Sequence, residues 1–237
     1  MSSSTQTPKS TYHLYTFYAS SCAARLRIAF NLKNIDYVPH YVDMNTDDHE
    51  SEAYRAINPS AAIPTLRIET EGEDPFTIAQ SVAILEFLEE TFPSRTPLLP
   101  PPSDTKARAR VRELMYIVTS DIFPPTNSRI AQSVKAVRGE REDALTFVRT
   151  IMNRGFATYE TYLSTYFPNG KYSADDAITL ADVCLIPQVE QARFYKIDFA
   201  QFPLLSGVIE RLEKVEAFRK AGWRMQGDTP EKDRLES

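Results

Sequence analysis

In the first 92 residues, segments whose apolar positions have the period of a strand alternate with segments whose apolar positions have the period of a helix. Tyr12–Phe17 is rich in aromatic residues and alternates in character, which predicts a strand. Cys22, Leu26 and Phe30 then recur at helical spacing. The same reasoning predicts a strand at 37–42, a polar helix at 47–57, a strand at 65–69, its hairpin partner at 75–79 and a helix at 81–92. This β-α-β-α-β-β-α order indicates a small α/β domain at residues 11–93, after a loose tail at 1–10.

The pattern changes at a proline-rich segment, residues 94–103, which we expect to be a stiff linker between domains. Beyond it only helical stripes occur, beginning with Ala107, Val111 and Leu114. Gly155 lies on the next stripe, where the missing side chain would either allow another helix to approach closely or weaken the helix. The second domain is therefore predicted to be a helical bundle at 104–225, followed by a loose polar end from Gln226. The predicted fold class is α/β plus all-α.

One helix start in this second domain is marked sharply. Thr179-Leu180-Ala181-Asp182 has the form of a capping box, with Asp182 in place of the usual glutamate. Thr179 can cap the amide of Asp182, whose carboxylate reaches back to the amide of Thr179. We therefore expect a structural role for Asp182.

Composition and charge narrow the possible functions. With 237 residues, 42% of them hydrophobic, the chain can build a substantial core. Its net charge of −5 argues against nucleic-acid binding and against adsorption to anionic membranes. No apolar run approaches the ~20 residues of a membrane span, and the polar N-terminus lacks the apolar core of a secretory signal. Two distant cysteines, Cys22 and Cys184, indicate a reducing compartment, which we take to be the cytoplasm, and the three histidines lack metal-site spacing.

The first cluster that could carry chemistry is Ser20-Ser21-Cys22, at the start of the first predicted helix. A helix N-terminus favours an anion, so a thiolate there is stabilised whether it belongs to the protein or to a ligand. The two hydroxyls can donate hydrogen bonds to sulfur. The alternative is that both serines serve only as caps.

Two further clusters precede or follow predicted strands. The Ile63–Pro64 bond, just before a strand, is a candidate cis peptide that would present the Ile63 backbone for strand-like pairing with a ligand. Gln80 and Ser81 open a helix, where amides and side-chain donors can hold a carboxylate. Here too the alternative is a simple cap.

Together these clusters resemble the zeta class of glutathione transferases, the class that includes maleylacetoacetate isomerase. The resemblance rests on Ser20-Ser21-Cys22-x-x-Arg25-x-Arg27-Ile28-Ala29, Asn58-Pro59, Ile63-Pro64-Thr65-Leu66, Gln80-Ser81-x-Ala83-Ile84 and Thr179-x-Ala181-Asp182-x-Cys184-Leu185-x-Pro187. It spans nearly the whole chain, and its Ser-Ser-Cys segment is the part most specific for the class. It implies a thioredoxin-like N-terminal domain that binds glutathione and a helical C-terminal domain that shapes the pocket for the second substrate.

The resemblance also implies roles for individual residues. Ser20 would stabilise the glutathione thiolate, and Cys22 beside it would tune the site more than attack. Arg25 would add positive potential near the sulfur. The other glutathione contacts would come from Ser21, His49 at the glycine end, Ile63 across cis-Pro64, Gln80 and Ser81 at the γ-glutamyl carboxylate, and Asn127 from the helical domain.

The chain departs from the class at several positions. Ala23 stands where a serine is usual, Ala62 where a polar residue is common, and Phe123 where a glutamine is expected. The arginine that the class uses for the substrate carboxylate corresponds best to Arg193, with an offset of one residue.

The implied activity is a glutathione-dependent cis–trans isomerisation of maleylacetoacetate type with some transferase activity, in aromatic amino acid catabolism. The thiolate would add to an activated double bond of an unsaturated diketo acid, rotation would follow, and the thiolate would leave. The alternatives are a general transferase for small electrophiles, favoured by Phe123, a thiol oxidoreductase using Cys22, and a non-catalytic glutathione-binding protein. The resemblance further suggests a homodimer.

Overall fold

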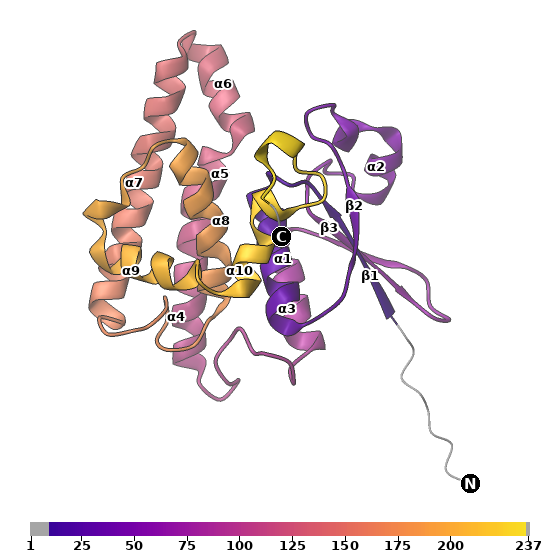
Figure 1. Cartoon of the computed structure of the whole chain (residues 1–237), viewed down its shortest axis with the longest axis horizontal. Coiled ribbons are helices and arrows are strands. Elements are labelled where there is room, and N and C mark those ends of the chain that lie inside the picture. The colour runs from indigo at the N-terminus through magenta and orange to yellow at the C-terminus, as the bar shows by residue number, and fades with distance from the viewer. Residues whose placement is uncertain (1–9, 236–237) are drawn as a thin grey trace. The chain divides into compact units, whose positions relative to one another are not determined.

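The computed structural model describes residues 10–235, which form two compact units. One unit holds residues 10–92 together with 221–235, and the other holds Pro93–Lys220. Figure 1 shows the elements of both units. The N-terminal residues 1–9, which include most of the expected tail, lie outside the described residues, and Ser10 already belongs to a strand.

A four-stranded sheet organises the first unit. Its strands are β1 (Ser10–Thr16), β2 (Val38–Tyr41), β3 (Thr65–Thr70) and β4 (Phe76–Ala79), in the order β2-β1-β3-β4. Strand β1 runs parallel to β2 and antiparallel to β3, and β3 and β4 form the expected hairpin. The predicted order of elements and the thioredoxin-like architecture are confirmed.

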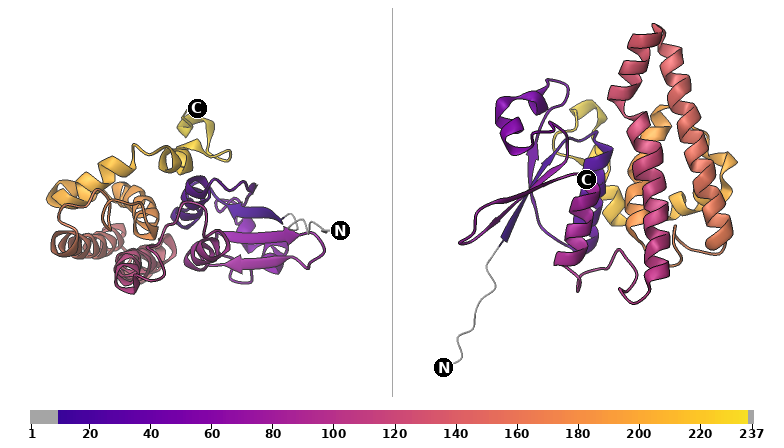
Figure 2. Two further views of the ribbon diagram at one scale, coloured as in Figure 1. Left: turned by 90° about the horizontal axis from the view of Figure 1, so that it is seen from below. Right: turned by 180° about the vertical axis from the view of Figure 1, so that it is seen from behind.

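Helices α1 (Ser21–Lys33) and α3 (Ser81–Thr91) lie together on one face of this sheet, as Figures 1 and 2 show. Leu14 of β1 and Leu66 of β3 stand opposite each other in register and are fully buried. Leu26 of α1 and Leu88 of α3 are also fully buried, so the apolar stripes read from the sequence form the core of this unit.

The helix expected at 47–57 is divided in the structure. A short 3₁₀ turn, η1 (Asp48–Glu50), comes first, and α2 (Glu52–Ile57) follows. Ser51 caps α2 because its Oγ accepts the amide of Tyr54 at 3.2 Å, and a capping residue has an extended backbone that interrupts the helix.

The second unit is helical, as predicted. Its elements are α4 (Thr105–Tyr116), the π-helical stretch η2 (Ile117–Ile122), α5 (Phe123–Thr126), α6 (Ser128–Arg138), α7 (Arg141–Tyr166), α8 (Leu180–Phe194), the 3₁₀ turn η3 (Phe199–Gln201), α9 (Pro203–Leu212) and most of α10 (Glu216–Ala221). The proline-rich segment packs within this unit. Leu98 is fully buried in it and accepts the Leu180 amide at 2.8 Å.

The predicted capping box at the start of α8 is present. The Asp182 carboxylate is fully buried and accepts the amides of Thr179 at 2.8 Å and Ser173 at 2.9 Å. One side chain therefore fixes both the first turn of α8 and the loop before it, which agrees with the structural role expected for Asp182.

Gly155 of α7 meets η2 at a close approach. A Cβ at this position would overlap the buried side chain of Ile122. Alanine would gain up to ~1 kcal/mol of helix propensity, while overpacking costs ~1–3 kcal/mol. We therefore expect Gly155→Ala to lower the free energy of unfolding by about 1 kcal/mol, measured by urea denaturation. An unchanged or raised value would show that Ile122 repacks without strain.

The C-terminal residues are ordered, so the expected loose end from Gln226 is wrong for residues 226–235. Asp228 accepts the Tyr18 amide at 2.8 Å, and Arg234 donates to the carbonyls of Gly227 and Thr229 at 2.7 and 2.8 Å. A polar segment without an apolar stripe can be ordered in this way, because hydrogen bonds hold it in place of apolar packing. Within residues 10–235, no helix has both the length and the apolar character needed to cross a bilayer.

Candidate functional site

The register of the sheet brings the three sequence clusters to one edge. Tyr15 at the end of β1 stands opposite Thr65 at the start of β3, and Thr65 stands opposite Ala79 at the end of β4. The start of α1, the Ile63–Pro64 bond and the start of α3 must therefore lie near one another. Phe17, Ala23 and Ile63 pack together as buried apolar residues. This packing holds the start of α1 next to the Ile63–Pro64 bond.

Ser20 is the N-cap of α1, and its Oγ accepts the Ala23 amide at 3.2 Å. A hydroxyl that accepts a hydrogen bond still has its own proton to donate, so the capping role and the proposed donor role are compatible. Ser21 and Cys22, both half-buried, are the first two residues of the helix. The free Cys22 thiol thus lies in the first turn, where the helix dipole favours negative charge.

The Ile63–Pro64 peptide bond is cis. Two side chains hold the segment before it: Tyr54 Oη and Asn58 Nδ2 donate to the Ala62 carbonyl at 2.7 and 2.8 Å. Burial raises the pKa of Tyr54, so its hydroxyl stays protonated as a donor. No hydrogen bond among residues 10–235 uses the N–H or C=O of the buried Ile63. Its backbone is available for pairing with an extended ligand.

Gln80 and Ser81 open α3, which has eleven residues. Gln80 is exposed, has a positive φ of 76° and makes no capping bond with its side chain. Ser81 is buried, and its Oγ accepts from Arg25 Nη1 at 3.1 Å. Arg25 is 2% exposed, and its hydrogen bond to Ser81 links the start of α1 to the start of α3.

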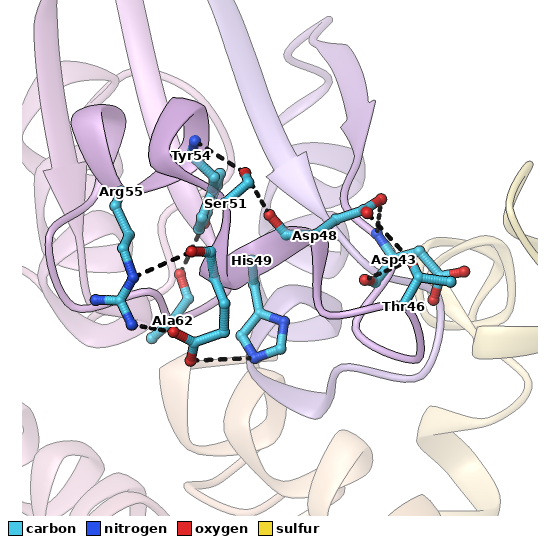
Figure 3. A network of polar contacts seen from close by, with 9 residues as sticks. Asp43, Thr46, Asp48, His49, Ser51, Tyr54, Arg55 and Ala62 are labelled. Atoms are coloured by element: carbon cyan, nitrogen blue, oxygen red, sulfur yellow. Dashed lines mark hydrogen bonds and ion pairs between the residues drawn. The ribbon is translucent and has the colours of Figure 1, made fainter.

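His49 lies in η1, beside the loop that leads into α2 (Figure 3). Its Nε2 is 3.7 Å from Glu50 Oε1, and Glu50 also pairs with Arg55. The Nδ1 atom is buried and has no hydrogen-bond partner among the described residues. A buried ring nitrogen without a partner is a candidate ligand contact.

Three residues considered from sequence lie in the second unit. Asn127 caps α6 by accepting the Arg129 amide at 3.0 Å, and Phe123 opens α5. Arg193 is exposed, and its guanidinium forms an ion pair with Glu213.

Sequence reasoning gave no role to Tyr54 and Arg27, which donate hydrogen bonds to the backbone beside these clusters. Tyr54 is the aromatic residue of α2, a short helix that also carries Glu52 and Arg55, and an aromatic side chain in such a helix is a sequence signal for burial. Arg27 is a cation on the apolar stripe of α1 and is 1% exposed. It donates to Thr16 Oγ1 and to the carbonyls of Phe17 and Tyr18, at 3.0, 3.3 and 3.2 Å.

Two of the histidines, His13 and His40, pair on the sheet. His13 Nδ1 lies 3.0 Å from His40 Nε2, and Tyr15 stacks on His40. Among residues 10–235, no group of three or more His, Cys, Asp and Glu side chains is arranged to hold a metal ion.

Burial, together with neighbouring His13, lowers the pKa of His40, against the opposing effect of Glu69. The unfolded chain then binds a proton more readily than the folded one, so stability falls as the pH drops below about 6.5. We expect the urea midpoint to decrease between pH ~7.5 and pH ~5.5, and His40→Gln to make that decrease smaller. Equal decreases in both proteins would contradict this assignment.

Known protein families match both units of the chain. The family model for the glutathione S-transferase N-terminal domain matches residues 19–91, and that for the C-terminal domain matches residues 115–216. The maleylacetoacetate isomerase maiA of Aspergillus fumigatus is 42% identical over 225 residues, covering 94% of this chain and 95% of that protein.

Solved structures agree. A bacterial maleylpyruvate isomerase, described as a glutathione S-transferase of the zeta class, superposes with a TM-score of 0.84 at 36% identity, over 92% of this chain and 100% of that one. A maleylacetoacetate isomerase from Anaeromyxobacter dehalogenans with glutathione in its active site has a TM-score of 0.84 at 33% identity, over 94% and 100%. The chain therefore belongs to the glutathione S-transferase family and, within it, to the zeta class.

Proposed function

We propose that this protein is a glutathione-dependent cis–trans isomerase of maleylacetoacetate type, with accompanying glutathione transferase activity. The observation that supports the proposal is that one buried cluster joins Ile63, whose backbone is unpaired within residues 10–235, to Ala23, whose amide donates to Ser20 Oγ. The identity of 42% to a maleylacetoacetate isomerase supports the choice of substrate class.

The residues present fit glutathione. The free N–H and C=O of Ile63 suit the cysteinyl part of a peptide, which pairs as a short strand would. The start of α3, with Gln80 and Ser81, suits the γ-glutamyl carboxylate. His49, with its free buried Nδ1, is the candidate at the glycine end.

Glutathione, when bound, supplies a thiolate that adds to an activated double bond and leaves again after rotation about the resulting single bond. The protein's part is to keep that sulfur ionised. Ser20 Oγ–H would donate to it, and the amide dipoles of α1 add positive potential. Cys22 lies in the same turn and tunes the site, and Arg25 holds the two helix starts in place through Ser81. We further propose that Asn127 contributes from the helical unit.

A second activity, conjugation of general electrophiles, is favoured by one observation. Arg193, the candidate for binding a substrate carboxylate, is already paired with Glu213. If that pair persists with substrate bound, the site loses selectivity for acidic substrates and accepts neutral electrophiles.

We also propose a cytoplasmic homodimer that acts in aromatic amino acid catabolism. Among residues 10–235, Cys22 and Cys184 form no disulfide, which suits a reducing compartment, and reduced glutathione must be present for activity. The zeta-class membership supports the dimer.

The test is to follow maleylacetoacetate or maleylacetone together with glutathione. We expect rapid isomerisation that requires glutathione and leaves its concentration unchanged. A matched assay with 1-chloro-2,4-dinitrobenzene measures conjugation. Conjugation without isomerisation would replace the proposed activity by the general transferase.

A further inference from the structure

A tight turn carries the chain from β1 to the catalytic end of α1. Its residues are Phe17 to Ser20, and the Ser20 amide donates to the Phe17 carbonyl at 3.0 Å. Because Ser20 is the last residue of this turn and caps the helix, the turn sets the backbone position from which its hydroxyl projects.

Arg27 holds the turn from the inside. Its guanidinium reaches back along α1 to Thr16, Phe17 and Tyr18, and its Nε donates to the Ala221 carbonyl at 3.0 Å. Ala221 is the point at which the chain returns to the first unit. The same buried cation thus binds both the turn and the start of the C-terminal segment.

The C-terminal strap, residues 222–235, holds the turn from the outside. Figures 1 and 2 show this yellow segment beside the indigo start of α1. Asp228 Oδ2 accepts the Tyr18 amide at 2.8 Å, across 210 positions of sequence. The strap packs closely on the sheet, because a Cβ on Gly227 would overlap the Tyr41 hydroxyl.

The strap is internally braced, so it can fix the position of Asp228. Arg234 donates to the carbonyls of Gly227 and Thr229, on either side of Asp228, and the Leu235 amide donates to the Arg224 carbonyl at 3.1 Å. The second oxygen, Asp228 Oδ1, is buried and has no hydrogen-bond partner within residues 10–235. Burial raises the pKa of Asp228, against the opposing effects of the Tyr18 amide and Arg27 and with a smaller contribution from Asp43. Asp228 is half-buried, and its Oδ2 is directed at the Tyr18 amide.

We propose that Asp228 is a positioning residue for the glutathione thiolate. It holds the Tyr18 amide, and through the turn it fixes the Ser20 hydroxyl at the place of the sulfur. A donor must be held within about 0.5 Å of its productive position to be effective. The inference rests on the proposed role of Ser20, but it assigns a function to the C-terminal strap.

The experiment titrates the thiol of glutathione bound to each protein by the ultraviolet absorbance of the thiolate, together with kcat and KM for isomerisation. The variants are Asp228→Ala, which removes the acceptor, and Asp228→Asn, which keeps a neutral acceptor. The matched control is Glu231→Ala, an exposed acidic residue on the same strap.

We expect Asp228→Ala to raise the pKa of the bound thiol and to lower kcat about tenfold, equivalent to ~1.4 kcal/mol, with KM for glutathione nearly unchanged. Asp228→Asn should lie between that variant and the wild type, and Glu231→Ala should match the wild type. If Asp228→Ala fails to fold, the comparison of Asp228→Asn with Glu231→Ala decides. If the thiol pKa is lowered equally in the wild type and in the folded Asp228 variants, the inference about Asp228 is wrong and the proposed function stands. A thiol pKa that is not lowered even in the wild type overturns the proposed function with it.

Discussion

Replacing Ser20 with alanine is expected to lower kcat/KM for isomerisation about 100-fold, the usual effect of removing one donor to a reacting anion. Without the hydroxyl, only the amides at the start of α1 stabilise the thiolate, so the pKa of the bound thiol should rise. The helix also loses its N-cap, since Ser20 Oγ accepts the Ala23 amide. That loss costs ~1 kcal/mol of stability, too little to unfold the protein. Initial rates at several pH values measure the effect, and rates that recover at high pH would locate it in the thiolate.

Two control variants accompany Ser20→Ala: the first tests whether another hydroxyl at this position suffices, and the second tests attack by Cys22. Ser20→Thr keeps both a hydroxyl and a capping group, so it should retain most activity. Cys22→Ala should change kcat/KM only a few-fold, because Cys22 tunes the site and does not attack. If Cys22→Ala abolishes activity while Ser20→Ala preserves it, the nucleophile is the protein's own thiol and the assignment of Ser20 is wrong.

Replacing Asp182 with alanine is expected to have the largest effect on stability, a decrease of about 3 kcal/mol in the free energy of unfolding. Two buried amides, those of Ser173 and Thr179, would lose their acceptor at once. Burial raises the pKa of Asp182, because enclosing an ionised carboxylate is itself costly. Its removal therefore offsets part of the loss. Urea denaturation of both proteins at neutral pH measures the difference.

The matched control for this prediction is Asp176→Ala in the same loop. Asp176 is exposed and accepts one amide, that of Lys171, at 3.2 Å. Its removal should cost less than about 1 kcal/mol. Similar losses at Asp176 and Asp182 would mean that the capping box contributes little beyond any surface contact.

The elements whose apolar positions face a core could be predicted from sequence. The stripe through Leu26 and Phe30 and the alternation in β1 and β3 lead directly to the observed packing, because burial requires those periods. The capping box could be read as well, since it needs only residues close in sequence.

Features made by distant polar contacts could not be predicted. The Tyr18–Asp228 bond joins positions 210 residues apart, and neither residue lies on an apolar stripe. Arg27 lies among the buried positions of α1, although a charged side chain is typical of a surface position. The carbonyls that accept its hydrogen bonds explain its burial. At the candidate site, the sequence suggested the groups that we propose to face glutathione but gave no role to Tyr54, whose Oη donates to the Ala62 carbonyl.

The central claim is that the start of α1, with Ser20, holds glutathione as a thiolate. Its most direct test is a titration of the thiolate absorbance of glutathione bound to the wild-type protein. The claim predicts a midpoint at least about one pH unit below that of free glutathione. A midpoint equal to that of free glutathione, in a complex shown to be saturated, would contradict it.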